Sequence, residues 1–286
     1  MPNSSQFFSK KVVVVTGAGS GIGRALALEL AHAGAFLALN DINEATLQKT
    51  SQLLPAFSAE YSIHVGDLSD ARQVQSFVAA VIKKHQRVDI LINNAGVALG
   101  RLKILDMSPE EWDWILGINL GGTLNCVRFF LPYLLQQKNA HIVNMSSIFG
   151  VAAVQERAGY CASKFAVIGL TEALRQELWG TQVQVSIVLP GGIRTNLAYN
   201  AKGWKDRVRQ QRDAKLVKEG SRTSAETAAK IILNGIKKRK YRILIGLDAK
   251  LLDLMVRILP SKYGPIINYF ITRAERKQAN KTNQAK

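Results

Sequence analysis

The chain has 286 residues, of which 47% are hydrophobic, and a formal net charge of +17; this is enough apolar material for one large domain or two small ones. The first ten residues carry no secretory signal, and no segment has the roughly 18 uninterrupted apolar residues of a membrane-spanning helix. Two cysteines, Cys126 and Cys161, are too few for a disulfide scaffold, so we expect free thiols and a cytoplasmic location.

Short β-rich runs alternate with helix-length amphipathic stretches over the first 245 residues. Several runs are almost entirely apolar, which suits strands that are buried on both faces of a parallel sheet. The alternation predicts a Rossmann-type, doubly wound α/β fold with about seven parallel strands and helices on both faces. We assign residues 1–246 to this domain, including its nucleotide and catalytic sites. The expected strands are 11–15, 36–40, 61–65, 89–93, 141–145, 183–189 and 242–246, and the clearest helices are 21–33, 70–86, 109–137 and 158–179.

The first expected strand runs directly into a glycine-rich segment, TGAGSGIGR, at residues 16–24. Its glycines permit a tight turn and let the backbone approach a pyrophosphate. The N-terminus of the following helix offers free N–H groups and the positive end of its dipole to that anion. A glycine cluster alone would indicate only a turn, but this strand–turn–helix context predicts a dinucleotide site. The site would include Gly17, Ser20, Gly21, Ile22 and Gly23.

Asp41 ends the second expected strand, 18 residues after Gly23. A carboxylate at this place can accept hydrogen bonds from both ribose hydroxyls of adenosine and would repel a 2′-phosphate. Neither Ser20 nor Ile42 supplies a cation that would attract such a phosphate. We therefore expect NAD as the cofactor, with NADP as the alternative. A helix cap or turn in the sequence NDIN would also explain this aspartate.

Further motifs follow in an order that resembles the classical type of the short-chain dehydrogenase/reductase family, over about residues 10–246. The resemblance implies an NAD(P)-dependent oxidoreductase that interconverts a secondary alcohol and a ketone. It also implies a small-molecule substrate and a homodimer or homotetramer. The matching segments are TGAGSGIG at 16–23, GDL at 66–68, NNAG at 93–96, GINLGG at 117–122, NMSS at 144–147, YCASK at 160–164 and PGGIRT at 190–195.

The segment YCASK places Tyr160 and Lys164 on one face of an expected helix, four residues apart. Such a pair alone would be an ordinary surface feature. An unperturbed tyrosine titrates near about 10, which is too high for proton transfer at neutral pH. A neighbouring ammonium should lower the pKa of Tyr160 and make it the general acid/base. The family resemblance implies that Lys164 also holds the nicotinamide ribose.

Two more catalytic residues are expected around this pair. Ser147, at the end of a strand, would hydrogen-bond the substrate oxygen, and the resemblance selects it over its neighbour Ser146. Asn119 resembles the residue that holds a proton-relay water near the lysine. Without Tyr160, we would interpret Ser147 as a turn residue, and Asn119 alone as a packing residue within a helix.

The remaining cofactor contacts come from the resemblance. Asp67 and Leu68 are expected beside the adenine, Asn94 and Gly96 where the backbone passes the cofactor, and Ile193 and Thr195 at the nicotinamide carboxamide. Helix caps and an ordinary turn are the alternatives for Asp67, Thr195 and Asn94. The four histidines lack ligand spacing, so no metal is expected.

The basic charge is concentrated in the last third, because residues 202–286 have a balance of +15 and residues 1–201 only +2. Residues 247–286 form an expected helical extension, either part of the same domain or peripheral to it. In its helix 248–259, Lys250, Asp253 and Arg257 form a narrow polar stripe, and the rest is apolar. This surface must pack on its own domain, on a second subunit or on an anionic membrane.

Two other functions are compatible with parts of the sequence. A nucleotide-binding sensor or scaffold without catalysis would keep the glycine loop, but the intact Ser147, Tyr160 and Lys164 argue against it. A nucleic-acid binder would explain the charge, but no groove-reading motif accompanies it, so we expect no nucleic acid. A hydrophobic or lipid-like alcohol or ketone is the substrate class consistent with the apolar C-terminal extension.

Overall fold

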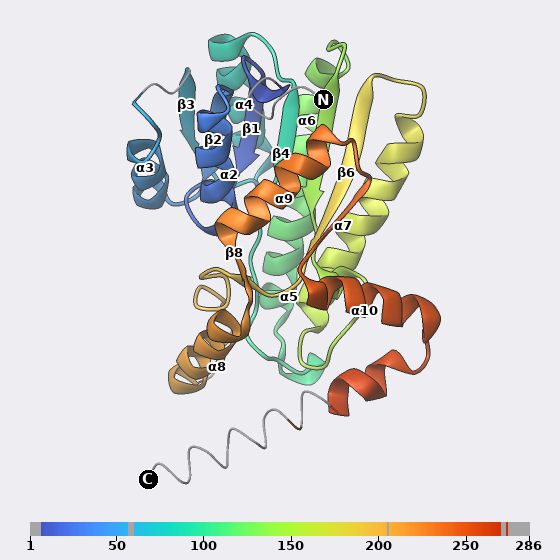
Figure 1. Cartoon of the computed structure of the whole chain (residues 1–286). Coiled ribbons are helices and arrows are strands. Elements are labelled where there is room, and N and C mark those ends of the chain that lie inside the picture. The colour runs from blue at the N-terminus through green and yellow to red at the C-terminus, as the bar shows by residue number, and fades with distance from the viewer. Residues whose placement is uncertain (1–6, 57–59, 205, 270–272, 274–286) are drawn as a thin grey trace.

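The computed structural model describes residues 7–56, 60–204, 206–269 and 273 of the chain. Seven parallel strands form one sheet in the order β3-β2-β1-β4-β5-β6-β9, which confirms the doubly wound α/β fold (Figure 1). The strands end within one residue of their predicted bounds. They are β1 (Val12–Thr16), β2 (Phe36–Asp41), β3 (Tyr61–Val65), β4 (Ile90–Asn93), β5 (Ala140–Met145), β6 (Val183–Pro190) and β9 (Arg242–Ile245).

Nine α-helices lie among the described residues, and the last of them, α10, follows the final strand. Four begin at a side-chain cap, such as Asn43 before α3 and Asp70 before α4. A short second sheet pairs β7 (Ile193–Arg194) with β8 (Thr223–Ser224). The helices are α2 (Gly21–His32), α3 (Glu44–Gln52), α4 (Ala71–His85), α5 (Pro109–Leu116), α6 (Gly122–Leu134), α7 (Ala158–Glu177), α8 (Arg207–Gly220), α9 (Ala225–Lys237) and α10 (Leu247–Ile258).

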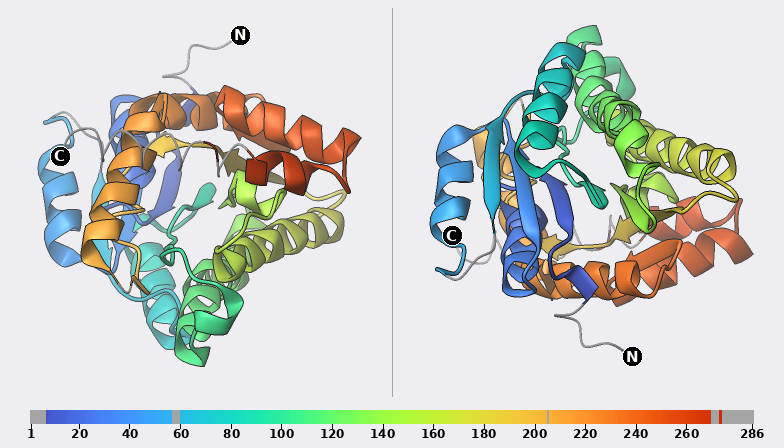
Figure 2. Two further views of the ribbon diagram at one scale, coloured as in Figure 1. Left: turned by 90° about the horizontal axis from the view of Figure 1, so that it is seen from below. Right: turned by 90° about the horizontal axis from the view of Figure 1, so that it is seen from above.

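The core has two layers because successive strand residues point to opposite faces of the sheet. In β1, Val13 and Val15 pack with α2, α3 and α9, whereas Val12 and Val14 pack with α4, α6 and α7. Figure 2 shows these two helical layers on either side of the sheet. Both faces are therefore apolar, and the nearly continuous valine run of this strand follows from that.

Helices α5 and α6 join through a π-helical turn, Gly117–Gly121, into a continuous helical segment Pro109–Leu134. By length and composition alone this segment could cross a membrane. However, Ile115, Phe130 and Leu134 are fully buried in the structure, and Phe130 and Leu134 pack beneath the sheet. One face of the segment therefore packs in the core of the domain.

The last strand leads directly into α10, whose orientation corrects one expectation. The sequence predicted Asp253 on a narrow polar stripe with Lys250 and Arg257, both of which are exposed. Instead Asp253 is only 8% exposed and forms ion pairs with Arg242 of β9 and with Arg257. Because a carboxylate is buried only when it is paired, the arginine in β9 determines which side of α10 faces the domain.

Candidate functional site

The glycine-rich segment forms the turn between β1 and α2. Gly17 and Gly21 have φ angles of +63° and +51°, in the left-handed region that favours glycine. A Cβ atom at Gly23 would lie 2.0 Å from the carbonyl oxygen of Gly17, so no side chain fits there. Ser20 stands at the N-cap of α2 and makes no side-chain cap hydrogen bond. The first N–H groups of α2 therefore face the loop, as binding of a dinucleotide pyrophosphate requires.

The segment after β4 is fastened to this loop. The backbone N–H groups of Asn94 and Ala95 each donate a 3.0 Å hydrogen bond to Thr16 Oγ1. The Asn94 side chain donates a 2.8 Å hydrogen bond to the Thr16 carbonyl. Asn94 therefore joins the carboxyl ends of two neighbouring strands and holds the backbone of both beside the candidate cofactor site.

Asp41 lies at the carboxyl end of β2 and is fixed by the glycine loop. Its Oδ2 accepts a 2.8 Å hydrogen bond from Gly19 N, and its Oδ1 accepts a 2.9 Å hydrogen bond from Asn43 N. The cap of α3 is Asn43, whose side chain accepts from Thr46 N, so Asp41 is not itself the helix cap. The carboxylate is thus held at the place where the adenosine ribose is expected.

Arg24 is a cation next to this loop that was not considered, with Ser20 and Ile42, as a partner for a 2′-phosphate. Its guanidinium donates to the carbonyl oxygen of Gly19 and, over 2.9 Å from Nε, to Thr50 Oγ1. A third bond of 3.3 Å reaches the carbonyl of Thr46. These bonds occupy Arg24 with the loop and α3, so its function is to support the loop beneath Asp41. Its position directly after the last glycine of the motif was the available signal.

The loop after β3 lies next to Asp41, since Gly66 N donates a 3.2 Å hydrogen bond to the Asp41 carbonyl. Asp67 Oδ1 accepts from both the N–H and the hydroxyl of Ser69, at 2.9 and 2.8 Å. Asp70, rather than Asp67, caps α4. Leu68 is buried, and its carbonyl accepts a 2.9 Å hydrogen bond from the Asn125 side chain. The two residues expected at the adenine therefore lie next to Asp41.

Asn119 is fully buried within the π-helical turn between α5 and α6. Its Oδ1 accepts a 2.8 Å hydrogen bond from Val97 N, and its Nδ2 donates to Val97 O at 3.1 Å and to Ser163 Oγ at 2.9 Å. Asn119 thus links the segment after β4 to α7. π-turns within α-helices are frequent at functional sites, because the extra residue redirects a side chain.

Gly96 brings Asn119 and Lys164 together. A Cβ atom at Gly96 would lie 3.1 Å from Lys164 Nζ and 3.2 Å from Asn119 Oδ1. A side chain at this position would therefore occupy the space beside the amine and the amide. The sequence predicted both residues for one site, and the fold places them around the same glycine.

Ser147 and Tyr160 lie side by side, close enough for the serine side chain to lower the pKa of the phenol. Ser147 follows β5, and its Oγ also accepts a 3.1 Å hydrogen bond from Phe149 N. The neighbouring Ser146 instead donates a 2.8 Å hydrogen bond to the Lys164 carbonyl. Of the two serines, Ser147 is thus the one beside the tyrosine, and Ser146 fastens β5 to α7.

The pKa values of Tyr160 and Lys164 are shifted mainly by burial. Burial raises the pKa of Tyr160, although its hydrogen bond with Ser147 and the charge of Arg157 lower it. Burial also lowers the pKa of Lys164 to about 8. The ammonium lies 5.9 Å from the centre of the Tyr160 ring and donates a 3.1 Å hydrogen bond to Met145 O.

The sequence therefore predicted the opposite direction for the pKa of Tyr160. Two physical causes explain the difference. Burial removes the water that would solvate a phenolate, and the Lys164 ammonium is directed at a backbone carbonyl. The cation that does act on Tyr160 is Arg157, at the N-cap of α7, which sequence reasoning missed. Its place three residues before the tyrosine was the only local signal.

The segment after β6 closes the other side of the glycine loop. Ile193 is buried in β7. A Cβ atom at Gly21 would lie 3.2 Å from Thr195 Cγ2, so this threonine contacts the loop directly. Thr195 Oγ1 accepts a 3.4 Å hydrogen bond from Leu197 N, which is not a helix cap because α8 begins only at Arg207. Both residues thus lie where the nicotinamide is expected.

Residues 195–204 then cross the segment that follows β4. Gly100 N donates a 2.6 Å hydrogen bond to the Lys202 carbonyl. A Cβ atom at Gly100 would lie 2.9 Å from the ring of Trp204, so the indole packs directly on this glycine. Lys202 in turn lies 4.5 Å above the ring of Trp114. These contacts join the segment after β6 to the segment after β4 and form a wall of aromatic and basic side chains there.

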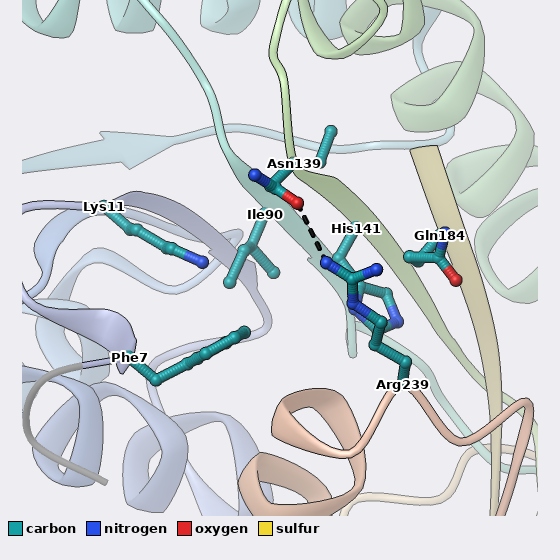
Figure 3. Close-up of a pocket in the computed structure, with 8 residues that line it drawn as sticks. Phe7, Lys11, Ile90, Asn139, His141, Gln184 and Arg239 are labelled. Carbon is teal, nitrogen blue, oxygen red and sulfur yellow. Dashed lines mark hydrogen bonds between the residues drawn. The ribbon is translucent and has the colours of Figure 1, made fainter. Parts of the chain in front are cut away.

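An open pocket of about 230 Å³ lies elsewhere, at the amino ends of the strands (Figure 3). Lys11 precedes β1, His141 lies near the start of β5, and Arg239 follows α9. All the predicted site residues lie at the opposite, carboxyl ends, where open α/β sheets bind their ligands. We therefore assign the cofactor site to the glycine loop and not to this pocket.

Comparison with known proteins agrees with this geometry. The short chain dehydrogenase family profile matches residues 11–206. SadH of Mycobacterium tuberculosis, which is named as an oxidoreductase, is 40% identical over 264 residues, which cover 91% of this chain and 95% of SadH. The 3-oxoacyl-[acyl-carrier-protein] reductase FabG of Thermotoga maritima is 36% identical over 65% of this chain and 75% of its own length.

Among solved structures, a short chain dehydrogenase/reductase from Burkholderia phymatum in complex with NAD is 33% identical, with a TM-score of 0.78. The match covers 83% of this chain and 89% of that structure. Levodione reductase is 26% identical with a TM-score of 0.76. With the family profile across more than half of its residues, this chain belongs to the short-chain dehydrogenase/reductase family.

Proposed function

We propose that the protein is an NAD-dependent oxidoreductase that interconverts a secondary alcohol and a ketone. The observation that carries this proposal is the proximity of the Ser147 and Tyr160 side chains, with the buried Lys164 one helical turn away. Such a pair can bind one substrate oxygen.

In this proposal each residue acts on a stated atom. The bound nicotinamide supplies or accepts the hydride. Tyr160 Oη donates a proton to the ketone oxygen, or accepts one from the alcohol in the reverse direction. Ser147 Oγ donates a hydrogen bond to the same oxygen and steadies its developing charge. Lys164, with a pKa of about 8, and a water held by Asn119 would pass the proton to and from solvent.

NAD is favoured over NADP by Asp41. Its carboxylate is held by Gly19 N and Asn43 N at the end of β2, where it would repel a 2′-phosphate. Arg24 is the nearby cation, but it already donates to Gly19, Thr46 and Thr50. NAD in complex with the Burkholderia phymatum structure is consistent with this choice.

A hydrophobic alcohol or ketone is the substrate class we propose. Exposed apolar side chains lie on the segments that follow the carboxyl ends of β4 and β6. Ile104 and Leu105 are on the first segment, and Leu197 is on the second. Together with the Trp204 wall, they would give an apolar rim to the site.

Further proposals concern assembly and location. Leu124 of α6 and Phe165 of α7 are exposed apolar side chains on neighbouring helices, which supports a homodimer or homotetramer. Cys126 and Cys161 are buried free thiols, which supports a cytoplasmic location. Sedimentation measurements on the purified chain would test the first of these proposals.

The function is tested by a panel of alcohols and ketones assayed by nicotinamide absorbance with NAD and with NADP. Tyr160→Phe should reduce turnover at least about a hundredfold and leave NAD affinity nearly unchanged, since a general acid/base contributes about 10²–10⁴-fold. Tyr61→Phe, at an exposed position in β3, is the matched control. Retained turnover in Tyr160→Phe would refute its role. NAD binding without turnover of any substrate would instead favour a nucleotide-binding sensor or scaffold.

A further inference from the structure

Helix α10 presents a row of large apolar side chains to the surface. Leu247, Leu251, Leu254 and Ile258 are 66, 57, 53 and 65% exposed. Their spacing of four, three and four residues places all of them on one face of the helix. We call these four residues the α10 stripe. Single exposed leucines are ordinary, but four on one helical face form a contiguous patch.

The domain fixes the direction of this stripe. On the opposite side of α10, Ala249 is fully buried and Asp253 pairs with Arg242 and Arg257. At the start of the helix, Asp248 Oδ2 accepts a 2.6 Å hydrogen bond from Gly192 N. Rotating the stripe into the domain would break these bonds and leave a buried carboxylate unpaired. The stripe is therefore held outward by the fold.

The apolar surface continues beyond α10. Leu259 and Tyr269 are also exposed, and residues 263–269 are helical. Figures 1 and 2 show α10 and this second helical segment at the end of the molecule that is remote from α3. The patch is thus at one extremity of the domain, where a flat surface can reach it.

Basic side chains surround the patch. Lys250, Arg257 and Lys262 are exposed on α10 and on the turn after it. The two acidic residues of α10, Asp248 and Asp253, are engaged with the domain on the other side. Residues 270–286 add five Lys or Arg and one Glu to the sequence. The rim of the patch is therefore cationic.

This charge decides between two occupants. A second copy of the chain would bring the same basic rim against itself, and the whole chain already carries +17. An anionic lipid surface would neutralise the rim and bury the leucines, as in helices that lie in a membrane interface. We propose that the α10 stripe docks the protein on anionic lipid bilayers.

The test is co-sedimentation of the full chain with vesicles. One set contains phosphatidylcholine and phosphatidylglycerol in equal parts, and the other contains phosphatidylcholine alone. The chain should sediment with the anionic vesicles at low salt and less at high salt, because screening weakens the basic contribution. Leu251→Gln with Leu254→Gln should weaken this binding at least about tenfold, because both side chains lose apolar area that the lipid would bury.

Two matched variants separate the contributions. Leu53→Gln with Trp179→Gln replaces two apolar side chains of similar or greater exposure elsewhere and should bind as the unmodified chain does. Lys250→Glu with Lys262→Glu should abolish the preference for anionic vesicles and leave the stripe intact. Circular dichroism and turnover of each variant establish that it is folded.

Three results would overturn the proposal. The first is an unmodified chain that stays in the supernatant with anionic vesicles at low salt. The second is equal binding by the Leu251 and Leu254 variant, which would place the lipid contact elsewhere. The third is a chain that ignores vesicles but whose oligomer size falls on substituting Leu251 and Leu254, since the stripe would then be a subunit contact.

Discussion

Asp248 Oδ2 accepts a 2.6 Å hydrogen bond from the backbone N–H of Gly192, across 56 positions in the sequence. A Cβ atom at Gly191 would lie 2.3 Å from the same oxygen, so this glycine pair is shaped around the carboxylate. The bond joins the start of α10 to the loop that carries Ile193 and Thr195. The C-terminal helix therefore supports the loop at which we expect the nicotinamide.

We expect Asp248→Ala to raise the KM for NAD about five- to thirtyfold, because losing a hydrogen bond to a charged group costs about 1–2 kcal/mol of loop positioning. Asp248→Asn keeps an acceptor oxygen and should have a smaller effect. Steady-state kinetics with NAD as the varied substrate measure this, and Asp113→Ala on exposed α5 is the control. An unchanged KM in Asp248→Ala would mean that the loop holds its shape without this bond.

The second prediction separates two functions of Asp41. Asp41→Ala should weaken the binding of NAD and reduce discrimination against NADP, because it removes both the negative charge and the acceptor for Gly19 N. Asp41→Asn keeps an oxygen for Gly19 and removes only the charge. It should therefore relax discrimination with less loss of NAD affinity. The ratio of kcat/KM for the two cofactors is the measurement, and equal ratios in all three proteins would contradict the assignment.

Most of the sheet could be predicted from the sequence because its five inner strands, β2, β1, β4, β5 and β6, are buried on both faces. Sequences such as that of β1, where all five residues are buried, are then apolar nearly without interruption, so the apolar run marks where the strand begins and ends. The motif residues were also predictable as a group, since they follow the carboxyl ends of parallel strands and must meet at one edge. Asn94 beside Thr16 is an example.

Contacts between distant segments could not be predicted in this way. Nothing local to Asp253 indicates that it pairs with Arg242, so the sequence predicted only a polar stripe with Lys250 and Arg257. The Asp248–Gly192 hydrogen bond likewise joins segments that are distant in the sequence, and no local pattern indicates it. The pKa of Tyr160 depends on how completely the fold removes water from the hydroxyl, which spacing within a helix does not report.

The third prediction concerns acid stability. Burial lowers the pKa of His141 to about 4, with smaller effects from the charges of Arg239 and Lys11. As the pH falls, the imidazole is protonated at about pH 6.5 in the unfolded chain and only at a lower pH in the folded protein. The resulting stability is present above about pH 6.5 and is lost as the pH falls towards 4.

When the pH is lowered from about 7 to about 4.5, the unfolding free energy of the unmodified protein should fall. The fall in His141→Gln should be smaller by about 2–3 kcal/mol. Urea unfolding at the two pH values gives both numbers. His32→Gln, which replaces an exposed imidazole on α2, is the control. Parallel losses in the unmodified protein and in His141→Gln would show that other groups carry the acid sensitivity.

The last prediction sets stability against function at Lys164. Burial lowers its pKa from 10.5 to about 8, so at neutral pH the fold holds an ammonium that would be more stable in water. Between these two values the unfolded chain binds the proton more tightly, and the stability of the unmodified protein rises with pH. The charge costs on the order of 3 kcal/mol at neutral pH, offset in part by the bond to Met145 O.

At about pH 7, the unfolding free energy of Lys164→Met, measured with urea, should be about 2 kcal/mol higher than that of the unmodified protein. The variant should also lose turnover. At about pH 9.5 the gap should narrow by about 2 kcal/mol, because the lysine of the unmodified protein is then neutral in the folded state. Lys83→Met, at an exposed position in α4, should show neither effect. If Lys164→Met were less stable at neutral pH, the Met145 contact would outweigh the cost of burying the charge.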